Sequence, residues 1–436
     1  MQQRLLNWLA VLAFAVWATP LFAQGLTLEI ANGNASALPI AVVPFQWQGS
    51  GAPPETNVSD IVANDLNRCG QFRALPKSDV VETPARGSEI KFPTWRLLKQ
   101  DYIVVGRVID QGAGEIKVEF ELYTVGDQKN LASLAISGQR SDLRGIAHRV
   151  ADTVYEKITG VRGAFDTRIA YVTARGTGNN ASYALMIADS DGYGPQQVVT
   201  SRQPLLSPAW SPDGRKLAYE SFERGSSAIY IQDIATGARE VVSARKGINS
   251  SPAFSPDGSK LALSLSNGVN PDIYVMDLGS RSLTQLTRNY AIDTEPVWSS
   301  DGATIYFTSD RGGKPQIYQV SVGGGESRIT FAGDQNLKAS VSYDGKKIAM
   351  SQGNKNMYHI AVLDRASGSN TPISPGNFDE SPSFAPNASM LLYAATEGPR
   401  DVLYAVSADG RVRQRLVLAD GDVRTPAWGP YRQRGQ

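Results

Sequence analysis

The chain has 436 residues, 42% of them hydrophobic and 19% charged, which favours two folded domains over one core or a disordered chain. Its 43 basic and 42 acidic residues nearly cancel, so it lacks the excess positive charge typical of nucleic-acid-binding proteins. The single cysteine, Cys69, excludes an internal disulfide. Because Cys69 falls on the apolar side of a predicted helix, we expect a buried small hydrophobe and not a reactive thiol.

Residues 1–23 are predicted to be a signal peptide. One charge, Arg4, precedes an apolar run from Leu5 to Val16, and Pro20 and the small Ala23 follow. This order is typical of an export signal that is cleaved after the small residue. An uncleaved anchor is the alternative, although the run is shorter than the about 20 residues that span a bilayer. We therefore expect an exported chain whose mature part does not insert into a membrane.

The segment that follows alternates Leu26, Leu28 and Ile30 with polar residues. Such a strand could stay free and add to the edge of another protein's sheet. It could equally be an edge strand of the domain that follows it.

Residues 24–163 are predicted to form a small α/β domain. Residues 39–45, PIAVVPF, are a continuous apolar run of strand length, and helical spacing follows them with Ser59 as a candidate N-cap. Further strands are expected at residues 102–108 and 116–125, before a last helix that Gly160 ends.

Residues 164–436 repeat one phrase. SPAWSPDG at Ser207 recurs, with changes, at intervals of 44, 44, 43, 43 and 44 residues. A repeat of this length with four short strands is the signature of a propeller blade. In each copy the Pro suits the start of a strand, the aromatic residue can pack between blades, and Ser-Pro-Asp-Gly suits a hairpin turn. We therefore interpret most of the repeated residues as scaffold.

The two ends of the repeat array predict how it closes. The first blade, from Arg168, lacks an innermost strand, whereas TPAW at Thr425 is an innermost strand with no blade after it. If the C-terminal strand completes the first blade, no sheet edge is left exposed at the joint. The sequence therefore predicts an all-β six-bladed propeller closed by its C-terminal strand.

The sequence offers little catalytic chemistry. Its two histidines, His148 and His359, fall in different predicted domains, and no G-x-S-x-G or Walker-type motif is present. One concentration of charge stands out, because the segments that lead into the innermost strands share one mouth of the propeller channel. Their acidic residues are Asp293, Glu295, Asp334, Asp379, Glu380 and Asp422, against the basic Arg202, Lys246, Lys338 and Arg424.

Several interpretations of this mouth remain open. It can be a solvated acidic rim, or it can receive a basic or amide-rich peptide. It can also hold Ca²⁺ or Mg²⁺, for which the possible ligands are Asp293, Glu295, Asp379 and Glu380. A metal-dependent active site is the least supported reading, since no general base stands out.

The order of these parts resembles a known family. A signal peptide, an α/β domain with PIAVVPFQW, and blades reading SPAWSPDGRKLAY, SPAFSPDGSKLAL and DIYVMDL that close on TPAWGPY resemble the TolB family of periplasmic propeller proteins of the Tol-Pal system. The resemblance covers the whole mature chain. The SPDG turns are shared with other propellers, whereas the domain order together with PIAVVPFQW is more specific.

The resemblance implies a non-enzymatic periplasmic adaptor without a cofactor, which supports outer-membrane integrity and cell division. By position, the lipoprotein Pal would bind the propeller mouth, and the C-terminal domain of TolA would bind the N-terminal segment at Leu26, Leu28 and Ile30. The implied Pal surface consists of Ile248, Asn249, Ser250, Ser251, Asp293, Thr294 and Glu295.

Two positions depart from the family pattern. The family often has a histidine where Ile248 stands, which affects the expected affinity and pH response of that contact, and the turn SYDG in the fourth copy lacks Pro. The alternative function is a propeller enzyme or ligand-binding protein that uses the acidic central channel.

Overall fold

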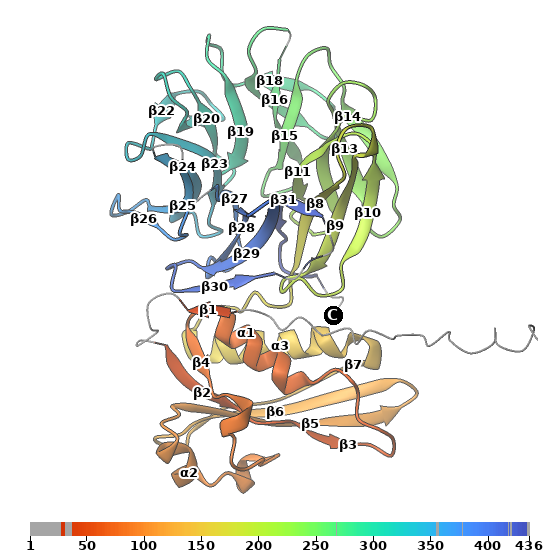
Figure 1. The fold of residues 1–436 in the computed structure, drawn as a ribbon, viewed down its shortest axis with the longest axis vertical. Helices are drawn as coiled ribbons and strands as arrows, with labels where there is room; N and C mark the ends of the chain where they lie inside the picture. The colour runs from red at the N-terminus through yellow and green to blue at the C-terminus, as the bar shows by residue number, and fades with distance from the viewer. Residues whose placement is uncertain are drawn as a thin grey trace, which may run out of the picture.

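The computed structural model describes residues 28–30, 37–266, 268–354, 357–376, 378–416, 418 and 421–433. They form an α/β domain and a six-bladed propeller, which Figure 1 shows one above the other. The predicted signal peptide and Leu26 lie outside the described residues. None of the helices in the described part is long and apolar enough to cross a membrane.

The α/β domain is built on one mixed sheet, in the order β4-β2-β5-β6-β7, with β3 also paired to β5. The apolar run at residues 39–45 forms a strand only in its first part, within β2, and β3 begins just after the run; both strands run parallel to β5. The antiparallel strands β5, β6 and β7 form a meander. The strands are β2 (Leu38–Val42), β3 (Gln46–Gln48), β4 (Phe72–Ala74), β5 (Tyr102–Gly112), β6 (Glu115–Thr124) and β7 (Asn130–Gln139).

Two longer helices, α1 (Val58–Arg68) and α3 (Leu143–Thr159), lie between this sheet and the propeller, and the short α2 (Phe92–Leu97) lies apart from them (Figure 1). The predicted cap at Ser59 is wrong by two residues: the Asn57 side chain accepts the Asp60 N–H. Gly160 ends α3 with φ 77°, as predicted.

Cys69 follows α1 and is wholly buried. Burial raises the pKa of its thiol to about 12, so the thiolate is not accessible at neutral pH. This confirms its interpretation as a buried hydrophobe.

The propeller has six blades. The four strands of each blade are named from the innermost to the outermost. Blade 1 is β31 (Asp422–Trp428), β8 (Arg168–Arg175), β9 (Ser182–Asp189) and β10 (Gln196–Ser201). Blade 2 is β11 (Leu205–Trp210), β12 (Lys216–Ser221), β13 (Ala228–Asp233) and β14 (Arg239–Ser243). Blade 3 is β15 (Asn249–Phe254), β16 (Lys260–Leu265), β17 (Asp272–Asp277) and β18 (Leu283–Gln285).

Blade 4 is β19 (Asp293–Trp298), β20 (Thr304–Ser309), β21 (Gln316–Ser321) and β22 (Glu326–Arg328). Blade 5 is β23 (Gln335–Val341), β24 (Lys347–Asn354), β25 (Met357–Asp364) and β26 (Asn370–Pro372). Blade 6 is β27 (Glu380–Phe384), β28 (Met390–Glu397), β29 (Arg400–Ser407) and β30 (Val412–Arg415). The predicted six-bladed propeller is confirmed.

The C-terminal strand closes the ring as predicted. β31 pairs antiparallel with β8, with Trp428 opposite Ile169. Trp428 is buried, and its Nε1 donates to Thr167 Oγ1 at 2.8 Å. The first blade therefore contains both ends of the propeller sequence, and neither β8 nor β31 is left as an open edge.

The segment that contains Leu28 and Ile30 was expected to be either a free strand or an edge strand of the α/β domain, and it is neither. β1 (Leu28–Ile30) pairs antiparallel with β30, so blade 6 has a fifth strand. The expectation of an edge strand of the α/β domain is therefore wrong, since β1 joins the propeller. β1 ends its sheet, and its other edge carries no strand among the described residues.

The repeated phrase is scaffold, as interpreted. In blade 2, Ser211 Oγ donates to Asp213 Oδ1 at 2.5 Å, which also accepts the Arg215 N–H, and Gly214 takes φ 68°. The aromatic position joins blades, because Trp298 Nε1 donates to Ala253 O of blade 3 at 3.0 Å.

Candidate functional site

Every innermost strand of the propeller contains a β-bulge near the channel mouth. The bulged residue is never glycine, yet its φ lies between 45° and 57° in all six blades. Such a conformation costs about 1–3 kcal/mol per residue, and bulges often re-aim side chains near binding sites. The six residues are Ser207, Ser251, Glu295, Lys338, Ser381 and Thr425.

Side chains of the preceding blade hold these bulges. Glu295 Oε2 accepts the Lys338 N–H at 2.9 Å, and Ser351 Oγ accepts the Ser381 N–H at 3.1 Å. Lys338 Nζ donates to Ser381 Oγ at 2.8 Å. Hydrogen bonds therefore connect blades 4, 5 and 6 at the mouth.

The structure brings together the two segments that the sequence assigned to a partner. They are the starts of β15 and β19, which are innermost strands of neighbouring blades and contact each other. Ile248 is exposed, and Ser250, Ser251, Thr294 and Glu295 are half-buried. These five residues therefore form one accessible surface across blades 3 and 4.

Two other residues of the predicted surface have no accessible side chain, since Asn249 and Asp293 are wholly buried. Asn249 Oδ1 accepts from Ser243 Oγ and from the Arg245 N–H, and its Nδ2 donates to the Arg245 carbonyl. In this structure Asn249 holds the loop that presents Ile248 and does not itself face a partner.

Asp293 is the acceptor of a buried ion pair. Arg311, which follows β20, donates to its two carboxylate oxygens at 3.1 and 2.8 Å, and Asn289 Nδ2 donates to it at 2.8 Å. The sequence analysis missed Arg311 as a counter-charge, because it lies in the loop after the second strand of its blade and not in a segment that leads into an innermost strand.

The other acidic residues of the mouth also have partners. Glu380 lies 3.3 Å from Lys338 Nζ, and Asp334 lies 3.6 Å from Lys314 Nζ. Asp379 is buried and accepts the Gly376 N–H at 3.0 Å. Burial raises the pKa of Asp379. The mouth is therefore less negative than the acidic residues alone suggested.

Exposed apolar side chains gather here, and the sequence analysis named only Ile248 among them. They come from the segments that lead into β15, β19, β23 and β27, and therefore share the face that carries the mouth. Tyr290 and Phe331 keep 85% and 77% of their surface exposed. Exposed apolar groups in one area mark interaction surfaces. The members are Ile248, Tyr290, Ile292, Phe331 and Phe378, and we call them the apolar rim.

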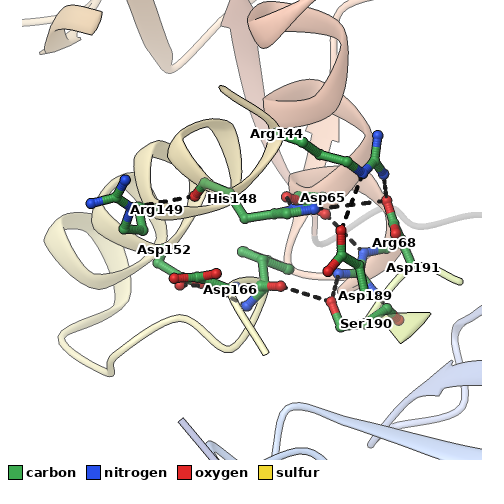
Figure 2. A network of polar contacts seen from close by, with 12 residues as sticks. Asp65, Arg68, Arg144, His148, Arg149, Asp152, Asp166, Asp189, Ser190 and Asp191 are labelled. Atoms are coloured by element: carbon green, nitrogen blue, oxygen red, sulfur yellow. Dashed lines mark hydrogen bonds and ion pairs between the residues drawn. The ribbon is translucent and has the colours of Figure 1, made fainter. Parts of the chain in front are cut away.

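A second polar cluster joins the α/β domain to blade 1 (Figure 2). Arg68 of α1 is buried, and its Nε donates to Asp65 Oδ1 at 3.0 Å. Its other two nitrogens donate to Ser190 O and Ser190 Oγ, just after β9, at 3.1 and 2.7 Å. One side chain thus ties a helix of the first domain to the propeller.

His148 of α3 lies in the middle of this cluster, 2.6 Å from Asp65 Oδ2 through Nδ1 and 4.0 Å from Asp191 Oδ2 through Nε2. Burial lowers the pKa of His148, but Asp65 and Asp191 outweigh burial and raise it above its usual value. Asp65, His148 and Asp191 are the one group of three potential metal ligands found in the described part of the chain. Arg144 and Arg68 already supply positive charge there, which disfavours a cation.

The second histidine lies elsewhere. His359 of β25 contacts Gln352 Oε1 at 3.2 Å, and burial lowers its pKa. The two histidines therefore belong to separate domains, as the sequence indicated, and do not form a joint site.

Comparison with known proteins assigns both domains. Residues 26–131 match the model of the TolB amino-terminal domain, and residues 155–432 match that of the TolB beta propeller domain. The chain belongs to the TolB family. It is 66% identical over 432 residues to the Tol-Pal system protein TolB of Xanthomonas campestris pv. campestris, with 98% of each chain covered.

Other members show the same likeness. The Tol-Pal system protein TolB of Xanthomonas oryzae pv. oryzae is 67% identical over 434 residues. The crystal structure of TolB from Acinetobacter baumannii superposes with a TM-score of 0.85 at 41% identity, covering 93% of this chain and all of that one. Family and fold are therefore established together over nearly the whole chain.

Proposed function

We propose that the chain is a non-enzymatic periplasmic adaptor of the Tol-Pal system, exported through a cleaved signal peptide. It binds the lipoprotein Pal through the propeller mouth and TolA through the N-terminal segment, and so supports outer-membrane integrity and cell division. Both partners are implied by membership of the TolB family.

One observation supports the assignment of the Pal-binding surface: the accessible residues of β15 and β19 lie next to the apolar rim. Ile248 immediately precedes β15, Ile292 immediately precedes β19, and both are exposed, while Thr294 is half-buried. Protein interfaces combine an apolar centre with satisfied polar groups, and the strained bulges hold the polar groups in place. A rigid surface loses little conformational entropy when a partner docks.

Thr294→Arg is expected to abolish capture of Pal. The larger cationic side chain would stand at the start of β19, next to the apolar rim, and keep a partner from close contact. We expect at least a hundredfold loss of affinity, or about 3 kcal/mol, the size of an interface hot spot, measured by calorimetry with purified Pal.

Thr284→Arg is the matched control. Thr284 is exposed on β18, the outermost strand of blade 3, so this variant should bind Pal as the wild type does. If Thr294→Arg binds Pal with unchanged affinity while both variants keep the wild-type melting temperature, the assignment of the mouth is wrong.

The proposed TolA segment includes β1. Because β1 ends the sheet of blade 6, a TolA strand could add to its other edge by backbone hydrogen bonds. A calcium ion in the channel also stays a proposal. Of its four predicted ligands, Asp293 already binds Arg311 and Glu380 lies beside Lys338, so an ion would compete with these pairs.

The alternative is a propeller enzyme or ligand-binding protein. It predicts hydrolysis, or saturable binding of a small molecule, that a chelator removes. His359 lies near Asp379 of the mouth, but burial lowers the pKa of His359 and raises that of Asp379. We favour the adaptor because the apolar rim borders the mouth.

A further inference from the structure

Glu220 breaks the pattern of the propeller mouth. It lies on β12 opposite Leu206, just before the bulge of blade 2. At the equivalent positions blades 3, 4 and 5 have a hydroxyl side chain, and blades 1 and 6 have Val172 and Ala394. The three hydroxyl residues are Ser264, Thr308 and Ser351. A carboxyl group at this position therefore exceeds what the scaffold requires.

Two of these hydroxyl residues hold the bulge of the next blade, whereas Ser264 Oγ of blade 3 has no hydrogen-bond partner among the described residues. Ser351 Oγ accepts the N–H of Ser381, the bulged residue of the next blade, and Thr308 Oγ1 accepts that of Lys338 at 3.2 Å. The Glu220 carboxyl lies close to the corresponding N–H, that of Ser251, since β12 packs against β15. One backbone donor uses one of about four acceptor positions of a carboxylate, and a serine would satisfy this donor equally well.

The surroundings give the Glu220 carboxyl no charged partner. Glu220 is 5% exposed and forms no ion pair among the described residues. Neither β11 nor β15, which pack against it, has an ionisable side chain, and Ile229 lies opposite it on β13. Burying a carboxylate that has no charged partner costs free energy. Burial accordingly raises the pKa of Glu220 to about 7.

Glu220 lies close to the accessible surface at the propeller mouth. Ser251, whose backbone N–H lies close to the Glu220 carboxyl, belongs to the accessible surface of β15, beside the exposed Ile248. A partner that docks on this surface therefore comes close to a carboxyl group that lacks a counter-charge.

We propose that Glu220 is a specificity-determining residue of the mouth, which receives a lysine or arginine side chain from the protein that docks over blades 2 and 3. This inference rests on the proposed function. A cation beside Glu220 favours its ionised form, so docking releases a proton wherever free Glu220 is protonated. Binding therefore becomes tighter as the pH rises through about 7.

The test is the affinity of residues 24–436 for purified Pal at pH 6 and at pH 8, by calorimetry. The wild type is expected to bind up to about tenfold more tightly at pH 8, the limit for one group of pKa about 7 that is ionised in the complex. Glu220→Gln keeps the shape without the charge, and should bind more weakly at pH 8 and lose this pH dependence.

Glu220→Ser is the second variant. It restores the side chain that blades 3 and 5 have at this position, so it should fold with the wild-type melting temperature and also bind without the pH dependence. If the wild type binds Pal equally at both pH values, or if either variant keeps the wild-type profile, the role of Glu220 is refuted and the adaptor function stands. If the wild type binds Pal at neither pH, both proposals fall.

Discussion

A chain that lacks residues 425–436 is expected to aggregate or to stay unfolded. The deletion removes most of β31 and with it the innermost strand of blade 1. The exposed backbone of β8 would then be a template for pairing with other chains. The loss also includes the carbonyl of Ala427, which accepts from Trp210 Nε1 of blade 2 at 3.0 Å, so two interfaces between blades open at once.

Size-exclusion chromatography and thermal melting followed by circular dichroism check this prediction. A chain that ends at Gln433 is the control, because it keeps β31 and Arg432, which forms ion pairs with Asp166 and Asp189. The control should be monomeric and melt like the wild type. A soluble monomer with unchanged melting after deletion of residues 425–436 would contradict the closed ring.

Arg68→Ala is expected to lower the free energy of unfolding by about 3–5 kcal/mol, the cost of removing one partner from a buried ion pair. Arg68 is 2% exposed. Its removal leaves the buried Asp65 with His148 as its remaining close partner, and takes two donors from Ser190. Because Ser190 belongs to the propeller, the attachment of the two domains weakens as well.

Urea unfolding of the wild type and the variant measures this effect. Lys77→Ala is the control, since Lys77 forms an exposed pair with Asp60 at 3.0 Å, and exposed pairs contribute about 1 kcal/mol or less. Equal losses in both variants would show that the Arg68 cluster does not stabilise the chain more than a surface pair does.

The propeller could be predicted from the sequence because its signals are local. Each SPDG turn needs only its own residues, such as the Ser211 and Asp213 side chains, and the repeat period counts the blades. The pairing of β1 with β30 could not be predicted in this way. Alternation of Leu28 and Ile30 indicates a strand, but it does not specify which of many sheet edges the strand joins.

The position of the site could be predicted from the sequence, but which of its polar side chains are accessible could not. The segments at Ile248 and Thr294 lie together because the channel brings every innermost strand to one mouth. Whether a polar residue there faces solvent depends on partners that are distant in sequence. Asp293 can be buried because Arg311, from the loop between β20 and β21, pairs with it. His148 lies near Asp191 only because two domains meet.

Hydrogen–deuterium exchange of residues 24–436, with and without purified Pal, tests the central claim most directly. If the mouth is the docking surface, Pal should slow exchange in residues 246–251 and 290–296, and leave the outermost strands β14, β18 and β22 unchanged. Protection confined to those outermost strands, or none at all at saturating Pal, would contradict the account.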